Sequence, residues 1–270
     1  MISAIPYRTF PSFHLGPVRI QTFGVFVAAG IAVGIWVFSR YARSRGLDAD
    51  ALSRLAFWIV ALGLVGSRLL FVFTHVGGFV DRPLAVFAVW EGGLQFSGAF
   101  LVSAGVIVWW LRRHPEVRGR RVVDGIVLGL APGLLIGRFG CAAVGEHLGE
   151  PTTFFIGWEY LGGPTREGLF APGTVIHNTA IYEIVLLVPL ALLLWWLARR
   201  RVPDGWVTVA FLLWYGVQRF ATDLLRAYDR RVFGLTGAQY LCIAMVLAGL
   251  AMAVRLGRRG RHVRRAPAAA

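Results

Sequence analysis

The residues best suited to chemistry in this sequence lie between positions 137 and 152, which read Gly-Arg-Phe-Gly-Cys-Ala-Ala-Val-Gly-Glu-His-Leu-Gly-Glu-Pro-Thr. Arg138 and Glu146 follow the apolar run 126–136. Ionisable side chains at membrane depth are costly, so they are usually functional or paired with one another. The stretch also contains four glycines: Gly137, Gly140, Gly145 and Gly149. Because glycine permits close helix packing and turns with positive φ, we expect this stretch to form the wall of a pocket.

Other arginines also lie within or beside long apolar runs. They are Arg68, Arg219 and Arg226, the last two with Asp223 between them. One interpretation is structural: the arginines pair with one another or with Glu183, or extend to the membrane interface. The other is a phosphate site, because guanidinium groups stay charged and bind phosphate bidentately. Several of them converging near the outer interface would suit a phospholipid head group.

Two segments combine carboxylate, imidazole and phenol groups. Glu146 and His147 open one long polar segment, and His177, Tyr182 and Glu183 close it. A carboxylate and an imidazole brought together there would act as a general base or orient a nucleophile. The alternative is a hydrogen-bond network at the interface that carries out no reaction.

The sequence predicts neither a metal site nor a cofactor. The remaining histidines, His14, His75, His114 and His262, lack ligand spacing with a second histidine, cysteine or carboxylate. Cys141 and Cys242 lie inside apolar runs and show no disulfide or metal spacing. Tryptophans near the ends of these runs are typical of an interfacial belt.

The composition predicts an integral membrane protein. Of 270 residues, 57% are hydrophobic and only 16% are charged. All 28 basic residues are arginine and the formal net charge is +14. Such a charge would suit nucleic acid if the arginines formed one solvated face, but they form clusters between apolar runs. We therefore predict no nucleic-acid partner.

Apolar runs long enough to cross a bilayer predict an all-α fold of about seven transmembrane helices. The predicted spans are residues 23–38, 55–74, 98–111, 122–144, 180–197, 206–225 and 240–256. The main arginine groups follow the first, third, fifth and seventh spans, so the positive-inside rule predicts an external amino terminus and a cytoplasmic carboxyl terminus. Residues 1–257 are expected to form one transmembrane domain, and residues 258–270 a basic cytoplasmic tail. The long polar segments on the external face are where we expect the chemistry.

Five segments, in order along the chain, resemble the motifs of one family. They are Trp90-Glu91-Gly92-Gly93-Leu94, the Gly137–Gly149 stretch, His177-Asn178-Thr179-Ala180-Ile181-Tyr182-Glu183, Tyr215-Gly216-Val217-Gln218-Arg219-Phe220 with Asp223 and Arg226, and Gly234-Leu235-Thr236-Gly237-Ala238-Gln239. The chain is similar to the prolipoprotein diacylglyceryl transferases of the bacterial inner membrane. Each motif is weak alone, but the ordered set is fairly specific.

The chain departs from that family's pattern at four positions. Phe23 stands where the family has tyrosine, Ser97 where it has histidine, and Cys141 and Val144 where it has asparagine. The tyrosine, the histidine and the first asparagine belong to the catalytic or substrate-binding set of the family. We therefore do not expect Phe23, Ser97 or Cys141 to be catalytic.

The resemblance implies transfer of a diacylglyceryl group from phosphatidylglycerol to the lipobox cysteine of a preprolipoprotein. Glycerol phosphate would be released and a thioether formed. The expected catalytic residues are Arg138, Glu146 and Arg219, with His147 or His177 replacing the missing histidine. The expected substrate-binding residues are Arg138, Arg219, Arg68, Gly140, Gly145, Tyr182, Glu183 and Arg226.

Two alternatives remain from the sequence. A divergent family member would bind phospholipid without this reaction or would use another acceptor, which the loss of the histidine at Ser97 favours. A transporter or channel would also explain buried arginines and glycines, but no inverted repeat is visible.

Overall fold

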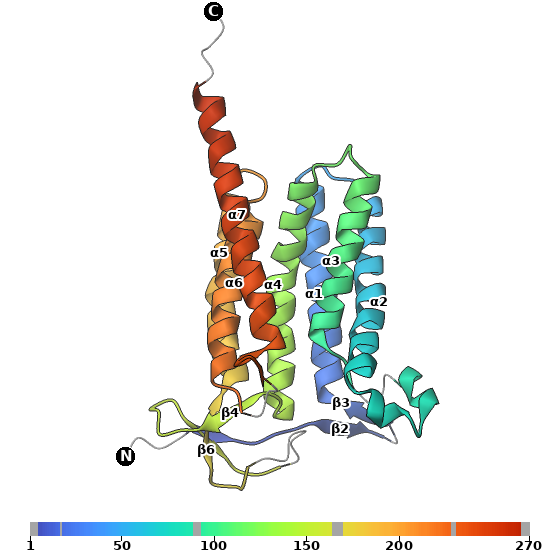
Figure 1. Cartoon of the computed structure of the whole chain (residues 1–270), viewed down its shortest axis with the longest axis vertical. Coiled ribbons are helices and arrows are strands. Elements are labelled where there is room, and N and C mark those ends of the chain that lie inside the picture. Colours follow the sequence, from blue (N-terminus) through green and yellow to red (C-terminus); the bar gives the residue numbers. More distant parts are fainter. Residues whose placement is uncertain (1–4, 17, 89–92, 164–169, 228–230, 266–270) are drawn as a thin grey trace, which may run out of the picture. The chain divides into compact units, whose positions relative to one another are not determined.

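The computed structural model describes residues 5–16, 18–88, 93–163, 170–227 and 231–265. Within these residues the chain forms seven α-helices together with short strands and two 3₁₀ turns (Figure 1). Packing divides the chain into two compact units. One comprises residues 1–38 with 123–270, and the other residues 39–122. The fold is therefore mostly helical, as predicted, with small sheets that the sequence did not predict.

Glycines hold two helices of the first unit in close contact. They are α1 (Thr22–Ser44) and α4 (Gly119–Val144), whose glycines recur at a spacing of four residues. A Cβ atom added to Gly129 would lie 2.4 Å from the carbonyl oxygen of Gly34, and one added to Gly30 would lie 2.6 Å from that of Gly133. Small residues at this spacing allow helix backbones to touch, which is how apolar helices associate in a bilayer.

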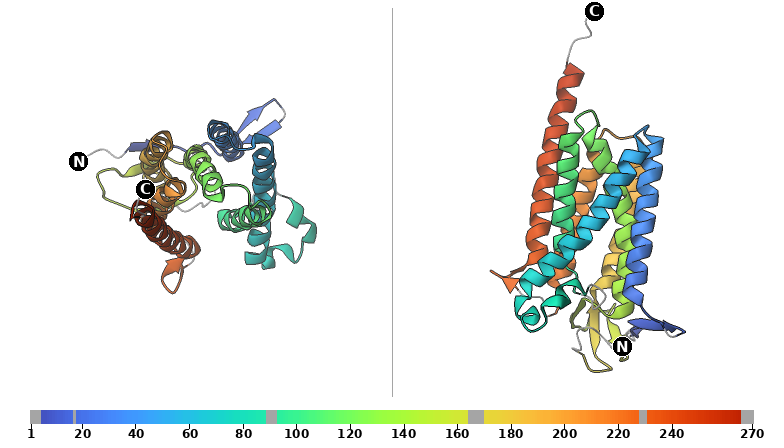
Figure 2. Two further views of the ribbon diagram at one scale, coloured as in Figure 1. Left: turned by 90° about the horizontal axis from the view of Figure 1, so that it is seen from above. Right: turned by 90° about the vertical axis from the view of Figure 1, so that its right-hand side faces the viewer.

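Three further helices of the first unit, α5 (Thr179–Arg199), α6 (Trp206–Leu224) and α7 (Gly237–Arg265), pack side by side (Figure 2). α7 contacts α6 along much of its length and continues to Arg265, past the predicted start of the tail at residue 258. The buried residues of α6 include several polar ones at helical spacing: Tyr215, Gln218, Arg219, Thr222 and Asp223. α6 therefore presents a polar stripe to its neighbours.

A buried carboxylate of α4 caps the amino terminus of α6. The Asp124 side chain is 2% exposed. Its oxygens accept bonds from the Gly205 N–H at 2.6 Å, the Thr208 N–H at 2.8 Å and the Thr208 hydroxyl at 2.6 Å. The first N–H groups of a helix have no partner within the helix, and the helix dipole favours a negative charge at that end. Asp124 therefore supplies from α4 the cap that α6 lacks in its own sequence.

The polar segments of the first unit form a four-stranded sheet rather than open loops. Its strand order is β1 (Ile5–Tyr7), β5 (Trp158–Tyr160), β6 (Val175–Asn178) and β4 (Leu148–Pro151). β1 pairs in parallel with β5, and the other pairs are antiparallel. Tyr7, Leu148, Tyr160 and Ile176 form its buried core, and the Tyr7 hydroxyl donates to the carbonyl of Ala142 in α4. The sheet thus fixes the chain that follows α4 and the chain that precedes α5.

Two small hairpins complete the strands of this unit. One joins β2 (Ser12–Leu15) to β3 (Val18–Gln21), and the other joins β7 (Arg231–Val232) to β8 (Leu235–Thr236). Both precede a helix directly. Their turns therefore set where α1 and α7 begin.

The second unit is built on two packed helices, α2 (Ala49–Thr74) and α3 (Phe96–Arg113). A Cβ added to Gly98 would lie 2.3 Å from the carbonyl oxygen of Gly66, so glycine again allows a close crossing. Two 3₁₀ turns, η1 (Val76–Phe79) and η2 (Pro83–Phe87), lie between the helices. Asp48 caps α2 by accepting the N–H groups of Asp50 and Ala51, and the backbone bond from Ala51 lowers the pKa of this carboxyl.

Among the described residues, five helices are long and apolar enough to cross a membrane: α1, α2, α4, α5 and α7 as far as Arg258. α3 and α6, which the sequence also predicted as spans, do not reach this standard of length and composition. In α6 the buried polar stripe lowers the mean hydropathy, and α3 is 18 residues long and ends in two arginines. The seven-span topology and its orientation stay a prediction.

Replacing Gly129 by alanine should loosen the contact between α1 and α4, because the new methyl group overlaps the Gly34 carbonyl. We expect a loss of about 1–3 kcal/mol of stability, the usual effect of overpacking, seen as a lower melting temperature in detergent. Gly137→Ala is the matched control in the same helix, since a Cβ there meets nothing within 4 Å. Equal melting temperatures for the two variants would contradict a packing role for this glycine.

Candidate active site

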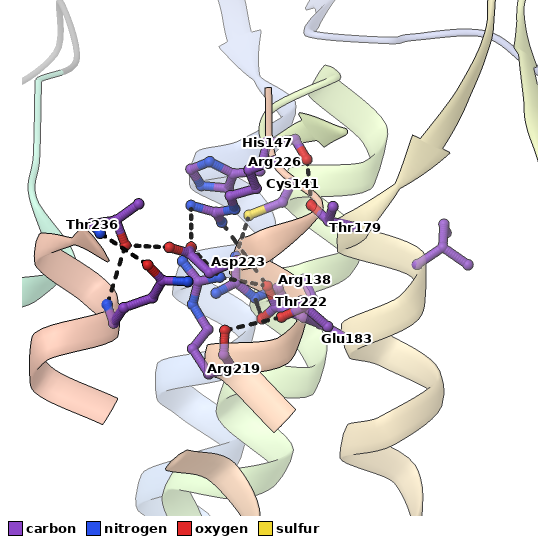
Figure 3. A network of polar contacts seen from close by, with 12 residues as sticks. Arg138, Cys141, His147, Thr179, Glu183, Arg219, Thr222, Asp223, Arg226 and Thr236 are labelled. Atoms are coloured by element: carbon purple, nitrogen blue, oxygen red, sulfur yellow. Dashed lines mark hydrogen bonds and ion pairs between the residues drawn. The ribbon is translucent and has the colours of Figure 1, made fainter. Parts of the chain in front are cut away.

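Three arginines and two carboxylates meet in one buried network (Figure 3). Arg138 comes from α4 and Glu183 from the first turns of α5. Arg219 and Asp223 come from the last turns of α6, and Arg226 follows that helix directly. The site is therefore assembled from three helices whose ends lie beside the sheet.

Glu183 is the centre of this network. Its Oε2 lies 2.6 Å from Arg138 Nε, and its Oε1 lies 3.2 Å from Arg219 Nη1. Arg226 Nη2 is 3.9 Å from the same Oε1. The Glu183 side chain is fully buried. A buried carboxylate is costly unless it is paired with cations. Here one carboxylate forms ion pairs with three guanidinium groups.

Asp223 forms a second bridge between two of these arginines. Its Oδ1 lies 2.8 Å from Arg219 Nη1 and 3.3 Å from Arg226 Nη1, and its Oδ2 accepts the Thr236 hydroxyl. Three guanidinium groups thus share two carboxylates in these contacts. Guanidinium groups bind anionic oxygens, often two at a time. The cluster therefore has the chemistry to bind an anionic group.

Thr236 ties the network to the start of α7. The Thr236 N–H donates to Gln239 Oε1 at 3.0 Å, and the Gln239 N–H donates to Thr236 Oγ1 at 3.1 Å. This reciprocal pair is a capping box. The same Thr236 hydroxyl donates to Asp223. One oxygen atom therefore belongs both to the cap of α7 and to the buried network of arginines and carboxylates.

A second polar group surrounds the carboxyl end of α4. Arg138 Nη1 donates to Cys141 Sγ at 3.5 Å, and the Glu146 N–H donates to the Cys141 carbonyl at 3.1 Å. Gly145 and His147 have φ values of 70° and 64°, which turns the chain back toward the helix end. The side-chain ligand atoms of Cys141, Glu146 and His147 lie within 4.8 Å of one another. The group is therefore next to the arginine network through Arg138.

His177 lies in a separate pair at the junction of β6 and α5. Its Nδ1 is 3.1 Å from the Tyr182 hydroxyl, which donates to the Ile156 carbonyl at 3.0 Å. Partial burial lowers the pKa of the His177 imidazole, although Glu150 acts in the opposite direction. The structure thus places His147, and not His177, in the group beside Arg138.

Known proteins resemble this chain over most of its length. The sequence model of the family described as prolipoprotein diacylglyceryl transferase matches residues 11–255. The chain belongs to this family. The resemblance inferred from the motifs is therefore confirmed.

Curated relatives cover nearly the whole chain. A phosphatidylglycerol–prolipoprotein diacylglyceryl transferase of Symbiobacterium thermophilum is 33% identical over 89% of this chain and 90% of its own length. Proteins with the same name from Synechococcus elongatus and Thermus thermophilus are each 30% identical. They cover 88% and 91% of this chain, and 83% and 97% of their own lengths.

The motif glycines of this family member have packing roles. A Cβ on Gly140 would lie 2.9 Å from Phe26 Cβ and 3.3 Å from Phe23 Cδ2, so Gly140 admits α1 beside the site. A Cβ on Gly149 would lie 2.7 Å from the Leu225 carbonyl. The backbone of Gly149 also forms an isolated antiparallel β-bridge with that of Arg226. This bridge fixes the backbone position of the third arginine of the network.

Arg68 belongs to the second unit, where its guanidinium binds backbone carbonyls. It donates to Val86 at 2.8 Å, Gly93 at 3.0 Å and Ala88 at 3.3 Å, and also to Ala85. These bonds hold the segment between α2 and α3. The predicted contact of Arg68 with a lipid phosphate stays a prediction, and Trp90, Glu91 and Gly92 lie outside the described residues.

The substitution Thr236→Val should remove both the helix cap and the bond to Asp223. We expect a loss of about 2 kcal/mol, because a cap and a hydrogen bond to a carboxylate are removed together. Thr222→Val is the matched control, since that hydroxyl bonds only a backbone carbonyl in the bonds described here. Melting in detergent compares the two variants, and an equal effect would argue against the shared-oxygen arrangement.

Proposed function

We propose that this chain transfers the diacylglyceryl group of phosphatidylglycerol to the lipobox cysteine thiol of a preprolipoprotein. The observation that carries the proposal is the buried network in which three arginines meet around two carboxylates. Membership of the transferase family and the names of the relatives support the choice of lipid and acceptor. The reaction changes no oxidation state and displaces a phosphate ester that the lipid already carries, so it requires no redox or energy-supplying cofactor.

The arginines act on the phosphate. In phosphatidylglycerol the phosphate is a diester with one negative charge, and cleavage turns it into glycerol phosphate with a second charge developing. Guanidinium groups held by Glu183 and Asp223 before the lipid arrives stabilise that new charge more than the starting charge. Arg138 and Arg219 are the proposed phosphate ligands. Arg226 contacts Glu183 and Asp223, the carboxylates that hold Arg219.

The acceptor thiol must lose its proton to become nucleophilic. The sulfur then attacks the lipid carbon that bears the phosphate ester, a C–S bond forms, the C–O bond breaks and glycerol phosphate leaves. Glu146 and His147 are the proposed acceptors of the proton, because they lie beside Arg138 in the group at the end of α4. His147 thereby takes over the task of the histidine that Ser97 replaces.

For the membrane, we propose seven spans in the bacterial inner membrane, with the amino terminus outside and the basic tail in the cytoplasm. The arginine clusters at the ends of alternate helices support this orientation. Arg199 lies 4.1 Å above the Trp195 ring and Arg113 lies 5.6 Å from that of Trp109, the mixture of cations and aromatics found at membrane interfaces. The network would then lie near the outer leaflet, where lipoprotein precursors emerge.

A second candidate is a family member that binds phospholipid without this reaction or uses another acceptor. Ser97 in α3, at the position of the family histidine, is the observation that favours it. Binding and turnover must therefore be measured separately.

Purified protein in detergent, mixed with phosphatidylglycerol and a lipobox peptide, should yield the diacylglyceryl peptide by mass spectrometry. Arg138→Ala should lower the rate at least about a hundredfold, because a buried charge that stabilises the leaving phosphate contributes several kcal/mol. Arg54→Ala, an exposed arginine of α2, is the control and should retain the wild-type rate. Bound phosphatidylglycerol without any adduct would overturn the transferase and support the second candidate.

Single variants separate the two histidines as proton acceptors. His147→Ala should lower the rate of adduct formation by roughly 10²–10⁴-fold, the range of general base catalysis. His177→Ala should change it little, because His177 contacts Tyr182 rather than the Cys141 group. The same kinetic assay measures the rate of adduct formation for each variant. Full turnover in the double variant would exclude both histidines from the reaction.

A further inference from the structure

A buried glutamine beside the arginine network has one hydrogen-bonding group without a partner. Gln239 lies in the first turn of α7 and is 0% exposed. Its Oε1 accepts the Thr236 N–H at 3.0 Å, and its backbone N–H donates to Thr236 Oγ1 at 3.1 Å. Its side-chain Nε2 has no hydrogen-bond partner among the described residues. The cap of α7 therefore uses the oxygen of this amide and not its nitrogen.

A buried amide nitrogen without a partner destabilises a folded protein, because the donor has lost its bonds to water. Most buried donors are therefore satisfied in native structures. The capping box needs only an acceptor at the position of Gln239, and glutamate provides one as well as glutamine does. The cap thus does not account for the N–H donors of the amide, whereas a ligand that accepts a hydrogen bond would account for them.

Hydrogen bonds and ion pairs connect Gln239 to the arginines. Thr236 Oγ1, which accepts the Gln239 N–H, donates its own proton to Asp223 Oδ2, and Asp223 Oδ1 lies 2.8 Å from Arg219 Nη1 (Figure 3). The side chains of Arg138 and Arg219 are 13% and 10% exposed, whereas Gln239 is fully buried. A head group whose phosphate binds the arginines would therefore extend inward toward Gln239.

The head group of phosphatidylglycerol ends in a glycerol that carries two neighbouring hydroxyl groups. A hydroxyl both accepts and donates hydrogen bonds. Gln239 Nε2 offers it a donor, and the carboxylate of Asp223, one hydrogen bond away through Thr236, is an acceptor. A protonated amine, as in phosphatidylethanolamine, has no lone pair to accept a bond from the amide. The diol is therefore the head-group chemistry that matches these side chains.

We infer that the Gln239 amide donates a hydrogen bond to a hydroxyl of the head-group glycerol and so selects phosphatidylglycerol over anionic phospholipids that lack the diol. The inference rests on the proposed function and deepens it, because it identifies a residue that recognises the leaving group. The arginines bind any phosphodiester, since their partner is the phosphate. The amide distinguishes what the phosphodiester carries, and it takes no part in making or breaking bonds.

Gln218 offers a matched comparison in the neighbouring helix. It is also buried, and its Nε2 also has no hydrogen-bond partner among the described residues. Its Oε1 accepts the Trp214 Nε1–H at 2.9 Å, and the same Nε1–H donates to the Leu186 carbonyl of α5. Gln218 thus lies on the side of α6 that contacts α5, whereas Gln239 lies at the start of α7.

The test compares two lipids that differ in the diol. Phosphatidylethanol has the same phosphodiester charge as phosphatidylglycerol, but its head group ends in an ethyl group without hydroxyls. Native mass spectrometry of the full chain in detergent measures the affinity for each lipid, and the lipobox peptide assay measures adduct formation. The wild type should bind phosphatidylglycerol at least about tenfold more tightly, the preference expected from one hydrogen bond in a buried site.

Gln239→Leu should reduce this preference to about threefold or less, because the donor to the hydroxyl is gone. In the adduct assay its KM for phosphatidylglycerol should rise while kcat changes little, since the bond is present before and during the reaction. Gln218→Leu should keep the wild-type preference. Thr236→Val weakens the same cap but retains the amide, so it should lower the melting temperature and keep the preference.

The two measurements separate the inference from the proposed function. Adduct formation by a wild type that binds both lipids equally would overturn the role of Gln239 and leave the transferase intact. A preference that depends on Gln239, without any adduct, would overturn the transferase and retain Gln239 as the residue that selects the lipid. An equal loss of preference in Gln218→Leu or Thr236→Val would show that packing determines the preference, and would overturn the assignment.

Discussion

The structure of the candidate site depends on one buried carboxylate. Glu183 is fully buried and lies within ion-pair distance of Arg138, Arg219 and Arg226. Without it, three cations would face one another in a region with little water, where each charge repels the others strongly. Glu183 and Asp223 offset that repulsion, so the three arginines are held close together in the folded protein. On the proposed function, the arginines are therefore in position before the lipid phosphate binds.

Several features far apart in the sequence determine the position of Glu183. The glycines of α1 and α4 let those helices touch, and the sheet fixes the chain on either side of the Glu146 segment. β6 ends at Asn178, whose side chain accepts the Ile181 N–H at 3.2 Å and so begins α5. Glu183 follows one turn later. The position of the central carboxylate is thus determined by a strand end, a helix cap and the spacing of a helical turn.

The helices could be predicted from the sequence because apolar runs of the right length have few alternatives in a bilayer. The strands could not, since each has two to four residues and β1 pairs with β5 more than 150 positions away. The motifs pointed to Arg138, Glu183, Arg219 and Arg226, which the structure brings together. They did not give Asp223 its bridging role. The Thr-x-x-Gln pattern at Thr236 is a capping signal that sequence alone can reveal. The position of His147 beside Cys141 depends on the turn at Gly145, which no linear spacing reveals.

The cap that Asp124 provides for α6 has a mechanical consequence. Asp124 and Arg138 are separated by roughly 20 Å along α4, at about 1.5 Å per residue, and both connect to the α6 side of the unit. At one end, Asp124 of α4 bonds the start of α6 directly. At the other end, Arg138 of α4 and Arg219 of α6 both contact Glu183 of α5. Sliding or tilting one helix against the other would break charged bonds at both ends. These contacts therefore oppose relative motion of α4 and α6. On the proposed function, the motions that admit a lipid are therefore expected in segments other than these two helices.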